Sequence, residues 1–232
     1  IIKTYILFMN YNFTKNFKEL PSSIPLFPLN KVLLLPRAKL PLNLFENRYL
    51  HMFDHALENG RFVGMVQPSD KLKSNSDIKN PKLYKIGCAG YITAFSQTND
   101  NRYEIILHGT CRFKIKKETE TINGFRKASV EWKDYSRDFE VEKLKSQEII
   151  REFLKLLKPF LDKLPMNVDW EMIEAMSDED LINTISMCCP FDVNEKQALL
   201  EAKNLESRFE ILKSLIQMSL NSNKFSDSRY AS

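Results

Sequence analysis

Short apolar runs broken by turn-forming residues dominate the first part of the chain, and this pattern predicts strands. Three such runs, at 24–30, 32–36 and 40–42, carry four prolines. Because proline lacks an N–H and fixes its own φ, it lies at the starts, edges and bulges of strands. We therefore expect short, irregular strands that lead into one amphipathic helix at about 46–59, closed by Gly60.

Alternation of apolar and polar residues continues beyond this helix and predicts further strands. We expect them at 62–66, 86–97, 102–107, 112–116 and 125–132. Residues 98–101 have the composition of a hairpin turn, since Asn and Asp tolerate left-handed φ. Gly109 marks a bulge or a corner. The polar stretch 67–84 lacks periodicity and is expected to be a long loop, either mobile or functional.

From about Phe139 the spacing of apolar residues changes from 2 to 3.6, which predicts helices. The apolar positions between Leu144 and Leu164 lie on one helical face, and Pro159 is expected to kink or interrupt that helix. Ser177 is an N-cap followed by an acidic first turn.

The last long helix is predicted to begin at Asp192, which forms a capping-box pattern with Glu195. Its apolar residues recur at spacings of four and three and form a seam that buries against other helices. The seam consists of Ala198, Ala202, Leu205, Phe209, Leu212 and Ile216.

These patterns predict an α+β protein in which a β-rich module at 24–134 precedes a helical bundle at 135–220. Residues 1–23 form an N-terminal extension that we expect to be partly disordered, and 221–232 form a polar tail. Charge follows the same division. The first module has a net charge of +7 and residues 135–232 have −5, so the two parts can attract each other.

Composition indicates a cytoplasmic protein of ordinary globular character, with 43% hydrophobic and 28% charged residues. The four cysteines, Cys88, Cys111, Cys188 and Cys189, have no paired CxxC spacing, which argues against a zinc ribbon and a secreted disulfide scaffold. The apolar stretch 1–9 is far shorter than the about 20 residues that span a bilayer. We expect no membrane segment, and Met9 is the expected start residue.

Several short motifs follow one another in an informative order. They are the runs 25–29, 32–36, 40–42, 46–49, 62–66, 86–92, 102–113, 126–128, 180–182 and 190–201. Their order over residues 24–216 resembles the N-terminal, substrate-binding domain of the ATP-dependent Lon protease family. Three positions depart from the family pattern: Arg37 stands where Gly is usual, Asn43 where His is frequent and Asn47 where Pro is frequent.

The resemblance implies a PUA-like β-barrel module with one helix, followed by an α-helical bundle. It also implies a stand-alone, non-catalytic module that binds polypeptide segments or unfolded proteins and needs no cofactor. An open strand edge or a groove between the two parts could hold such a segment, and the 67–84 loop could gate either. Oligomeric state is not predicted.

Arg48 and Arg112 are the candidate partner-binding residues, through a partner's carboxylate or backbone. The alternative is that each forms a structural bond within the domain, and this is the commoner role for arginines of this kind. His51 and His55 are spaced i, i+4 and could share a metal ion. The pattern is not HExxH and offers no third ligand, so we predict no metal site.

RNA binding through the basic β-rich half is the alternative function, with Lys114, Lys116 and Lys117 as a small cationic cluster beside Phe113. The cluster is short and no RNP motif accompanies it, so a solvated surface is the commoner explanation. Enzyme chemistry is not expected. No glycine is followed by Lys or lies within two residues of a Ser, which excludes a Walker A loop and a GxSxG elbow. A hydrolase without a sequence signature is the third alternative.

Overall fold

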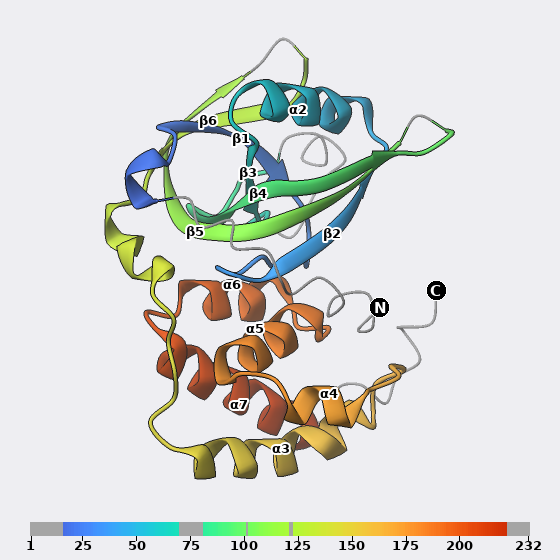
Figure 1. Ribbon diagram of the computed structural model, residues 1–232, viewed down its shortest axis with the longest axis vertical. Coiled ribbons are helices and arrows are strands. Elements are labelled where there is room, and N and C mark those ends of the chain that lie inside the picture. Colours follow the sequence, from blue (N-terminus) through green and yellow to red (C-terminus); the bar gives the residue numbers. More distant parts are fainter. Residues whose placement is uncertain (1–15, 70–80, 101, 121–122, 222–232) are drawn as a thin grey trace.

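The computed structural model describes residues 16–69, 81–100, 102–120 and 123–221 (Figure 1). In this part of the chain the strands form one six-stranded sheet in the order β2-β5-β4-β3-β1-β6. The strands are β1 Ser23–Pro28, β2 Lys39–Leu44, β3 Phe62–Val66, β4 Ile86–Gln97, β5 Tyr103–Glu120 and β6 Arg126–Glu131. The helices follow as a separate layer, which confirms the predicted α+β class.

The long strand β5 closes most of the sheet into a ring. Its second half pairs with β6, for example Ile115 with Val130, and β6 pairs with β1. The five strands β5, β4, β3, β1 and β6 therefore form a small barrel, visible as the ring in Figure 1. Strand β2 stands outside this ring and pairs with the first half of β5.

Helix α2, Asn47–Glu58, lies across one end of the barrel, and the helices of the second part of the chain, from residue 147 on, lie below the other end (Figure 1). Gly60 follows its C-cap residue Asn59 with a φ of +94°, which agrees with the predicted helix end. The other helices are η1 Phe17–Glu19, η2 Lys133–Phe139, α3 Gln147–Leu161, α4 Trp170–Glu174, α5 Asp178–Cys188, α6 Val193–Glu201 and α7 Leu205–Asn221. Sequence periodicity did not predict the turn η2.

The apolar run 32–36 is not a strand, in contrast to the prediction. Leu33, Leu34 and Leu35 are buried in an irregular segment that packs on Gly109 of β5. A Cβ atom built on Gly109 would lie 2.0 Å from the carbonyl oxygen of Leu35. Beside Gly109, a register shift leaves Thr110 without a partner on β4, which confirms the predicted bulge.

The last predicted helix is in fact two helices, because the backbone leaves helical geometry at Ala202 (ψ 132°). The predicted seam is therefore divided between α6 and α7. Ala198 is exposed, while Leu199 and Leu200 form the buried face of α6. The capping box of Asp192 and Glu195 is present as predicted.

The first bundle helix also differs from the prediction at its ends. It begins at Gln147, so Leu144 precedes it, and it continues through Pro159 to Leu161. Ser177 caps α5 as predicted, accepting a hydrogen bond from the Asp180 N–H at 3.2 Å.

One apolar cluster extends from the barrel into the helices. It contains Leu34, Leu35 and Phe53 from the first part of the chain together with Phe160 and Phe191 from the second. A second cluster, which includes Phe113, fills the barrel beside β1 and β6. The two parts thus share a core, and their relative position is fixed by packing.

The predicted loop 67–84 is described only at its ends. Pro68 and Leu83 form a β-bridge, and the main-chain N–H groups of Ser69 and Tyr84 donate across the same pair of segments. Residues 70–80 lie outside the described residues, as do Met9 and the rest of 1–15.

Candidate functional site

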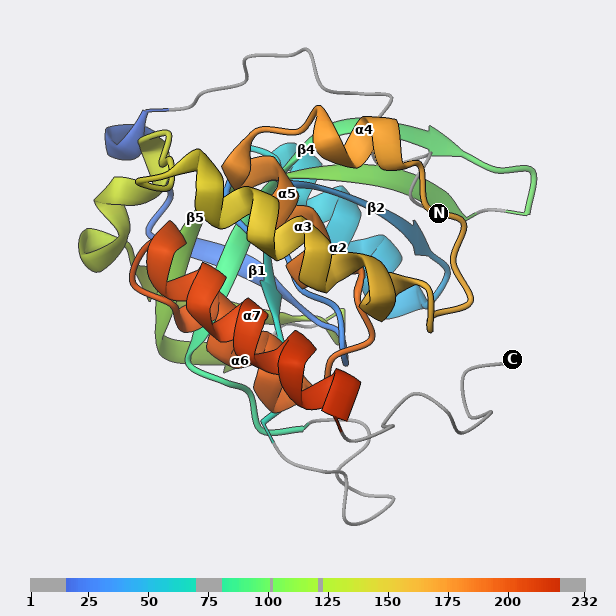
Figure 2. The same cartoon turned by 90° about the horizontal axis from the view of Figure 1, so that it is seen from below.

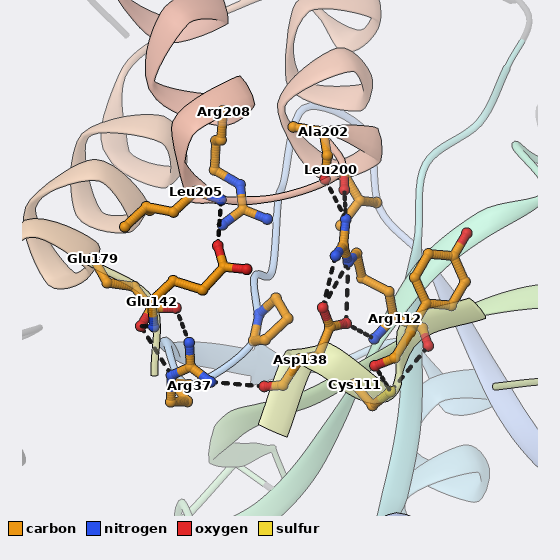
Figure 3. Close-up of polar contacts among 12 residues, drawn as sticks. Arg37, Cys111, Arg112, Asp138, Glu142, Glu179, Leu200, Ala202, Leu205 and Arg208 are labelled. Atoms are coloured by element: carbon orange, nitrogen blue, oxygen red, sulfur yellow. Dashed lines mark hydrogen bonds and ion pairs between the residues drawn. The ribbon is translucent and has the colours of Figure 1, made fainter. Parts of the chain in front are cut away.

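Arg112, one of the two predicted partner-binding residues, lies inside the protein between the barrel and the helices (Figure 3). Its guanidinium forms an ion pair with Asp138, with Nη2 2.7 Å from Oδ1. Asp138 also accepts the main-chain N–H of Arg112 at 2.8 Å. On its other side the guanidinium donates to the carbonyl oxygens of Leu200 and Ala202.

These contacts stabilise the C-terminal end of α6. The last carbonyls of a helix have no partner within it and carry a partial negative charge. Arg112 satisfies two of them, and Arg208 of α7 donates to a third, that of Leu199, at 3.0 Å. Burial lowers the pKa of Arg208 to about 10, and the neighbouring Arg112 adds to this effect. Both guanidinium groups nevertheless stay charged at neutral pH.

Arg37 makes a second set of contacts between the barrel and the helices, a region that we call the junction. Its guanidinium pairs with Glu179 at the start of α5 and donates to the Asp138 carbonyl oxygen at 2.7 Å. Its backbone has a φ of +64°, the left-handed region in which glycine is favoured. This conformation gives a physical reason for the glycine usual at this position. Burial raises the pKa of Glu179, and Arg37 opposes that shift.

Sequence analysis did not identify Arg37, Asp138, Glu179 or Arg208 as members of this junction. One signal was available for Arg208, which lies three residues after Leu205 and four before Leu212 on the buried face of α7. A charged residue on such a face requires a buried partner. The partner residues themselves are not readable from spacing, because they are distant in sequence.

Arg48, the other predicted residue, lies near the surface at the start of α2. Its guanidinium pairs with Glu46 at 2.7 Å and stands 4.5 Å from the centre of the Tyr49 ring. About a third of the side chain (35%) is exposed, so a ligand could reach it.

Two exposed aromatic side chains lie where the sheet extends beyond the barrel. We call this extension the three-stranded arm; it comprises β2, residues 94–97 of β4 and residues 103–108 of β5. The arm projects past the helical layer in Figures 1 and 2. Phe95 on the arm is 47% exposed and Phe45, directly after β2, is 62% exposed. The Phe95 ring packs against Phe53 of α2, with centroids 5.3 Å apart.

The two histidines of α2 have separate surroundings. His51 is exposed, whereas the His55 ring lies 3.4 Å from the Lys127 ammonium and 3.4 Å from the Asn59 side chain. Burial, with a contribution from Lys127, lowers the pKa of His55. Within the described ranges, no three His, Cys, Asp or Glu side chains gather as they would around a metal ion.

The lysines of the predicted cationic cluster are exposed on β5. Lys116 lies 3.6 Å from Glu131, which also pairs with Lys133 at 3.2 Å. Acidic side chains therefore neutralise part of this cluster.

All four thiols are held in the protonated form, which disfavours nucleophilic chemistry. Burial raises the pKa of the Cys188 thiol to about 11, and it raises the pKa of Cys88, Cys111 and Cys189 as well. None of the helices in the described part of the chain combines the length and the apolar composition that crossing a membrane requires.

A small β-barrel, capped by one helix and joined through a shared core to a helical bundle, defines a class of domain found in solved structures. One is a Lon N-terminal domain protein from Xanthomonas campestris (TM-score 0.59, 23% identity, 84% of this chain and 98% of that one). Another is the N-terminal domain of the Mycobacterium avium complex Lon protease (TM-score 0.59, 16% identity, with the same shares covered). At these identities the likeness shows the fold.

Sequence comparison gives the family. Residues 23–218 match the ATP-dependent protease La (LON) substrate-binding domain, and the chain belongs to that family. Relatives include the Lon proteases of Dictyoglomus thermophilum, 24% identical over 196 residues, and Flavobacterium johnsoniae, 27% identical over 197 residues. Each alignment covers 83% of this chain but 24% of the relative. The chain thus spans about a quarter of the length of the curated relatives it matches.

Proposed function

We propose that this protein binds segments of other polypeptides without altering them covalently, in the manner of a substrate-recognition domain. The exposed aromatic surface of the three-stranded arm is the observation that carries the proposal. Phe45 and Phe95 present large apolar side chains to solvent, and aromatic residues supply much of the binding energy in protein interfaces. Membership of the substrate-binding domain family supports the same role.

The chemistry of the chain supports a binding role over a catalytic one. The thiols are protonated at neutral pH because they are buried. Three buried charged groups have structural partners: Arg112 pairs with Asp138, and Arg112 and Arg208 both donate to main-chain carbonyls of α6. These groups therefore hold the structure together. We expect binding to need neither a nucleotide nor a cofactor.

Titration with a permanently unfolded protein, such as reduced and carboxymethylated α-lactalbumin, tests the proposal. Fluorescence anisotropy without nucleotide should show saturable binding in the micromolar range. The double variant Phe45→Ser/Phe95→Ser should bind at least about tenfold more weakly, because truncating central anchors costs about 2 kcal/mol or more. Its circular dichroism spectrum and melting temperature establish that it folds.

Met218→Ser is the matched control, since Met218 is an equally exposed apolar residue (66%) on α7, away from the arm. It should leave the affinity unchanged. Absence of binding by the parent protein, or equal affinities for parent and double variant, would contradict the proposal.

A further inference from the structure

The outer edge of β4 is open along the three-stranded arm. Strand β3 pairs with β4 only from Cys88 to Tyr91, whereas β5 pairs with β4 as far as Gln97. Among the described residues, no strand pairs with positions 93–97 on the side where β3 ends. All four residues 94–97 are exposed.

Alternation of the ladder shows which main-chain groups lie on that edge. The Thr98 N–H donates to the Arg102 carbonyl oxygen of the opposite segment at 2.9 Å. In an antiparallel pair, successive residues direct their N–H and C=O groups to opposite sides. Since Thr98 bonds toward β5, the N–H and C=O groups of Phe95 and Gln97 point away from it. The edge thus offers donors and acceptors at the spacing of a β-strand.

The other outer edge of the arm, that of β2, is blunted. The Gly109 N–H donates to the Ala38 carbonyl oxygen at 2.8 Å. By alternation, Leu107 and Ile105 of β5 also direct their main-chain N–H and C=O groups toward β2. By the register of this pair, the main-chain groups of Leu40 and Leu42 hydrogen-bond to β5. The main-chain groups of Pro41 and Asn43 therefore face outward. Proline has no N–H to donate, and it is a common device against pairing at an edge strand.

We infer that the open edge of β4 takes an extended polypeptide segment as an added antiparallel strand, which is a more specific form of the function proposed above. Such a strand would follow the line of β3, which is itself antiparallel to β4. Apolar side chains at alternate positions of the added strand would lie on the same face of the sheet as the Phe95 ring.

The positive charge of Arg61 favours an acidic residue at the C-terminal end of the added segment. An added strand with this direction ends beside Arg61, whose carbonyl oxygen already accepts the Ile92 N–H at 2.9 Å. Arg61 is exposed on the turn between α2 and β3. A carboxylate, from Asp, Glu or a chain terminus, would complement this guanidinium. The occupant is thus an extended segment with alternating apolar residues and an acidic end.

A pair of proline substitutions tests this edge against the other one. Gln97→Pro removes an outward N–H from β4, and Asn43→Pro removes an outward N–H from β2, so each leaves the bonds to β5 in place. The probe is a fluorescein-labelled peptide of sequence Thr-Val-Thr-Val-Thr-Asp. Gln97→Pro should weaken its binding at least tenfold, and Asn43→Pro should change it less than twofold.

Two further measurements do not depend on how the proline variants fold. The same peptide with N-methylated valines should lose binding to the parent protein, because it cannot donate to the edge. With both peptides amidated at the C-terminus, Arg61→Gln should weaken the peptide ending in Asp by about fivefold and leave the version ending in Asn unchanged. Equal affinities for the plain and N-methylated peptides would overturn the inference.

The proposed function and the added-strand mode fail in different ways. If the parent binds unfolded α-lactalbumin while Gln97→Pro and N-methylation have no effect, the mode is wrong and the function stands. If the parent binds neither the unfolded protein nor the peptide, both are wrong. If it binds the peptide in the edge-dependent way described, both are supported.

Discussion

Arg112 and Asp138 form an ion pair that is sealed from solvent, with side chains 6% and 4% exposed. Arg112 belongs to the barrel strand β5, Asp138 to the turn η2 that leads into the bundle, and the same guanidinium reaches the end of α6. One residue therefore joins three elements. Arg112 belongs to the motif 102–113 that resembles the family pattern, and its side chain holds the two parts of the protein together.

Removal of one partner of this pair should be strongly destabilising. Arg112→Met leaves the Asp138 carboxylate buried without a counter-ion, which costs about 3 to 5 kcal/mol. Urea denaturation of the variant measures the loss. The double variant Arg112→Met/Asp138→Leu should be less destabilised than the sum of the single variants, with a coupling of about 0.5 to 3 kcal/mol. Additive losses would show that the two side chains act independently.

Substitution of Arg37 separates backbone strain from side-chain bonding. Arg37→Gly loses the charged bonds to Glu179, about 1.5 to 3 kcal/mol, and relieves about 1 kcal/mol of strain at a φ of +64°. We expect a net loss of about 0.5 to 2 kcal/mol. Arg37→Ala loses the same bonds without that relief, so it should be about 1 kcal/mol less stable than Arg37→Gly in urea. An alanine variant as stable as the glycine variant would contradict the strain argument.

Asn47→Pro should stabilise the protein. Asn47 is the first residue of α2, where proline fits because the N–H has no partner within the helix. The preceding residue, Glu46, has the extended backbone (φ −77°, ψ 132°) that a following proline requires. The expected gain is about 0.4 to 1 kcal/mol, measured as a rise in melting temperature. A lower melting temperature would show that the N–H is needed.

Gly109→Ala should prevent normal packing of the segment 32–36. The added methyl group would overlap the Leu35 carbonyl, which is main chain and cannot rotate away. We expect a loss above about 3 kcal/mol, in the range of severe overpacking. Gly60→Ala is the matched control, because nothing lies within 4 Å of its Cβ position, and it should cost about 1 kcal/mol for its positive φ alone. Equal losses would exclude the overlap as the cause.

Acid should weaken the fold partly through His108 on β5. Burial lowers the pKa of His108, with Lys39 and Arg37 adding to the shift and a bond to the Arg37 main chain opposing it. The folded state therefore binds this proton less readily than the unfolded state. Its stability contribution is complete above the ordinary pKa of 6.5 and is lost as pH falls through and below that value.

The expected result is a smaller decrease in urea midpoint between pH 7.5 and pH 5 for His108→Gln than for the parent. Other titrating groups, including Glu179, are common to both proteins and cancel in the comparison. Identical decreases would show that His108 does not titrate differently in the folded state.

The sequence was most informative where local chemistry decides the structure. Gly60 ends α2, Ser177 caps α5, and the alternation of Tyr103, Ile105 and Leu107 gives the buried face of β5. Each depends on residues that are near neighbours along the chain.

It was least informative where a distant residue decides. The Ala202 carbonyl at the break bonds to Arg112, 90 residues earlier, and the apolar spacing of α6 and α7 alone is compatible with one helix. The run 32–36 has the composition of a strand, but it pairs with none of the described strands and packs on Gly109 instead. The junction could not be predicted for the same reason, since opposite charges carry no information about which of them meet.

Strand β5 gives the protein a mechanical property. Its first half belongs to the arm and is hydrogen-bonded on both sides, to β2 and to β4, and its second half closes the barrel by pairing with β6. Tension applied to a chain held at the hairpin would act along the strand, so many hydrogen bonds would have to break together in shear. The arm therefore resists being peeled from the molecule, a property that the proposed binding of an added strand would use.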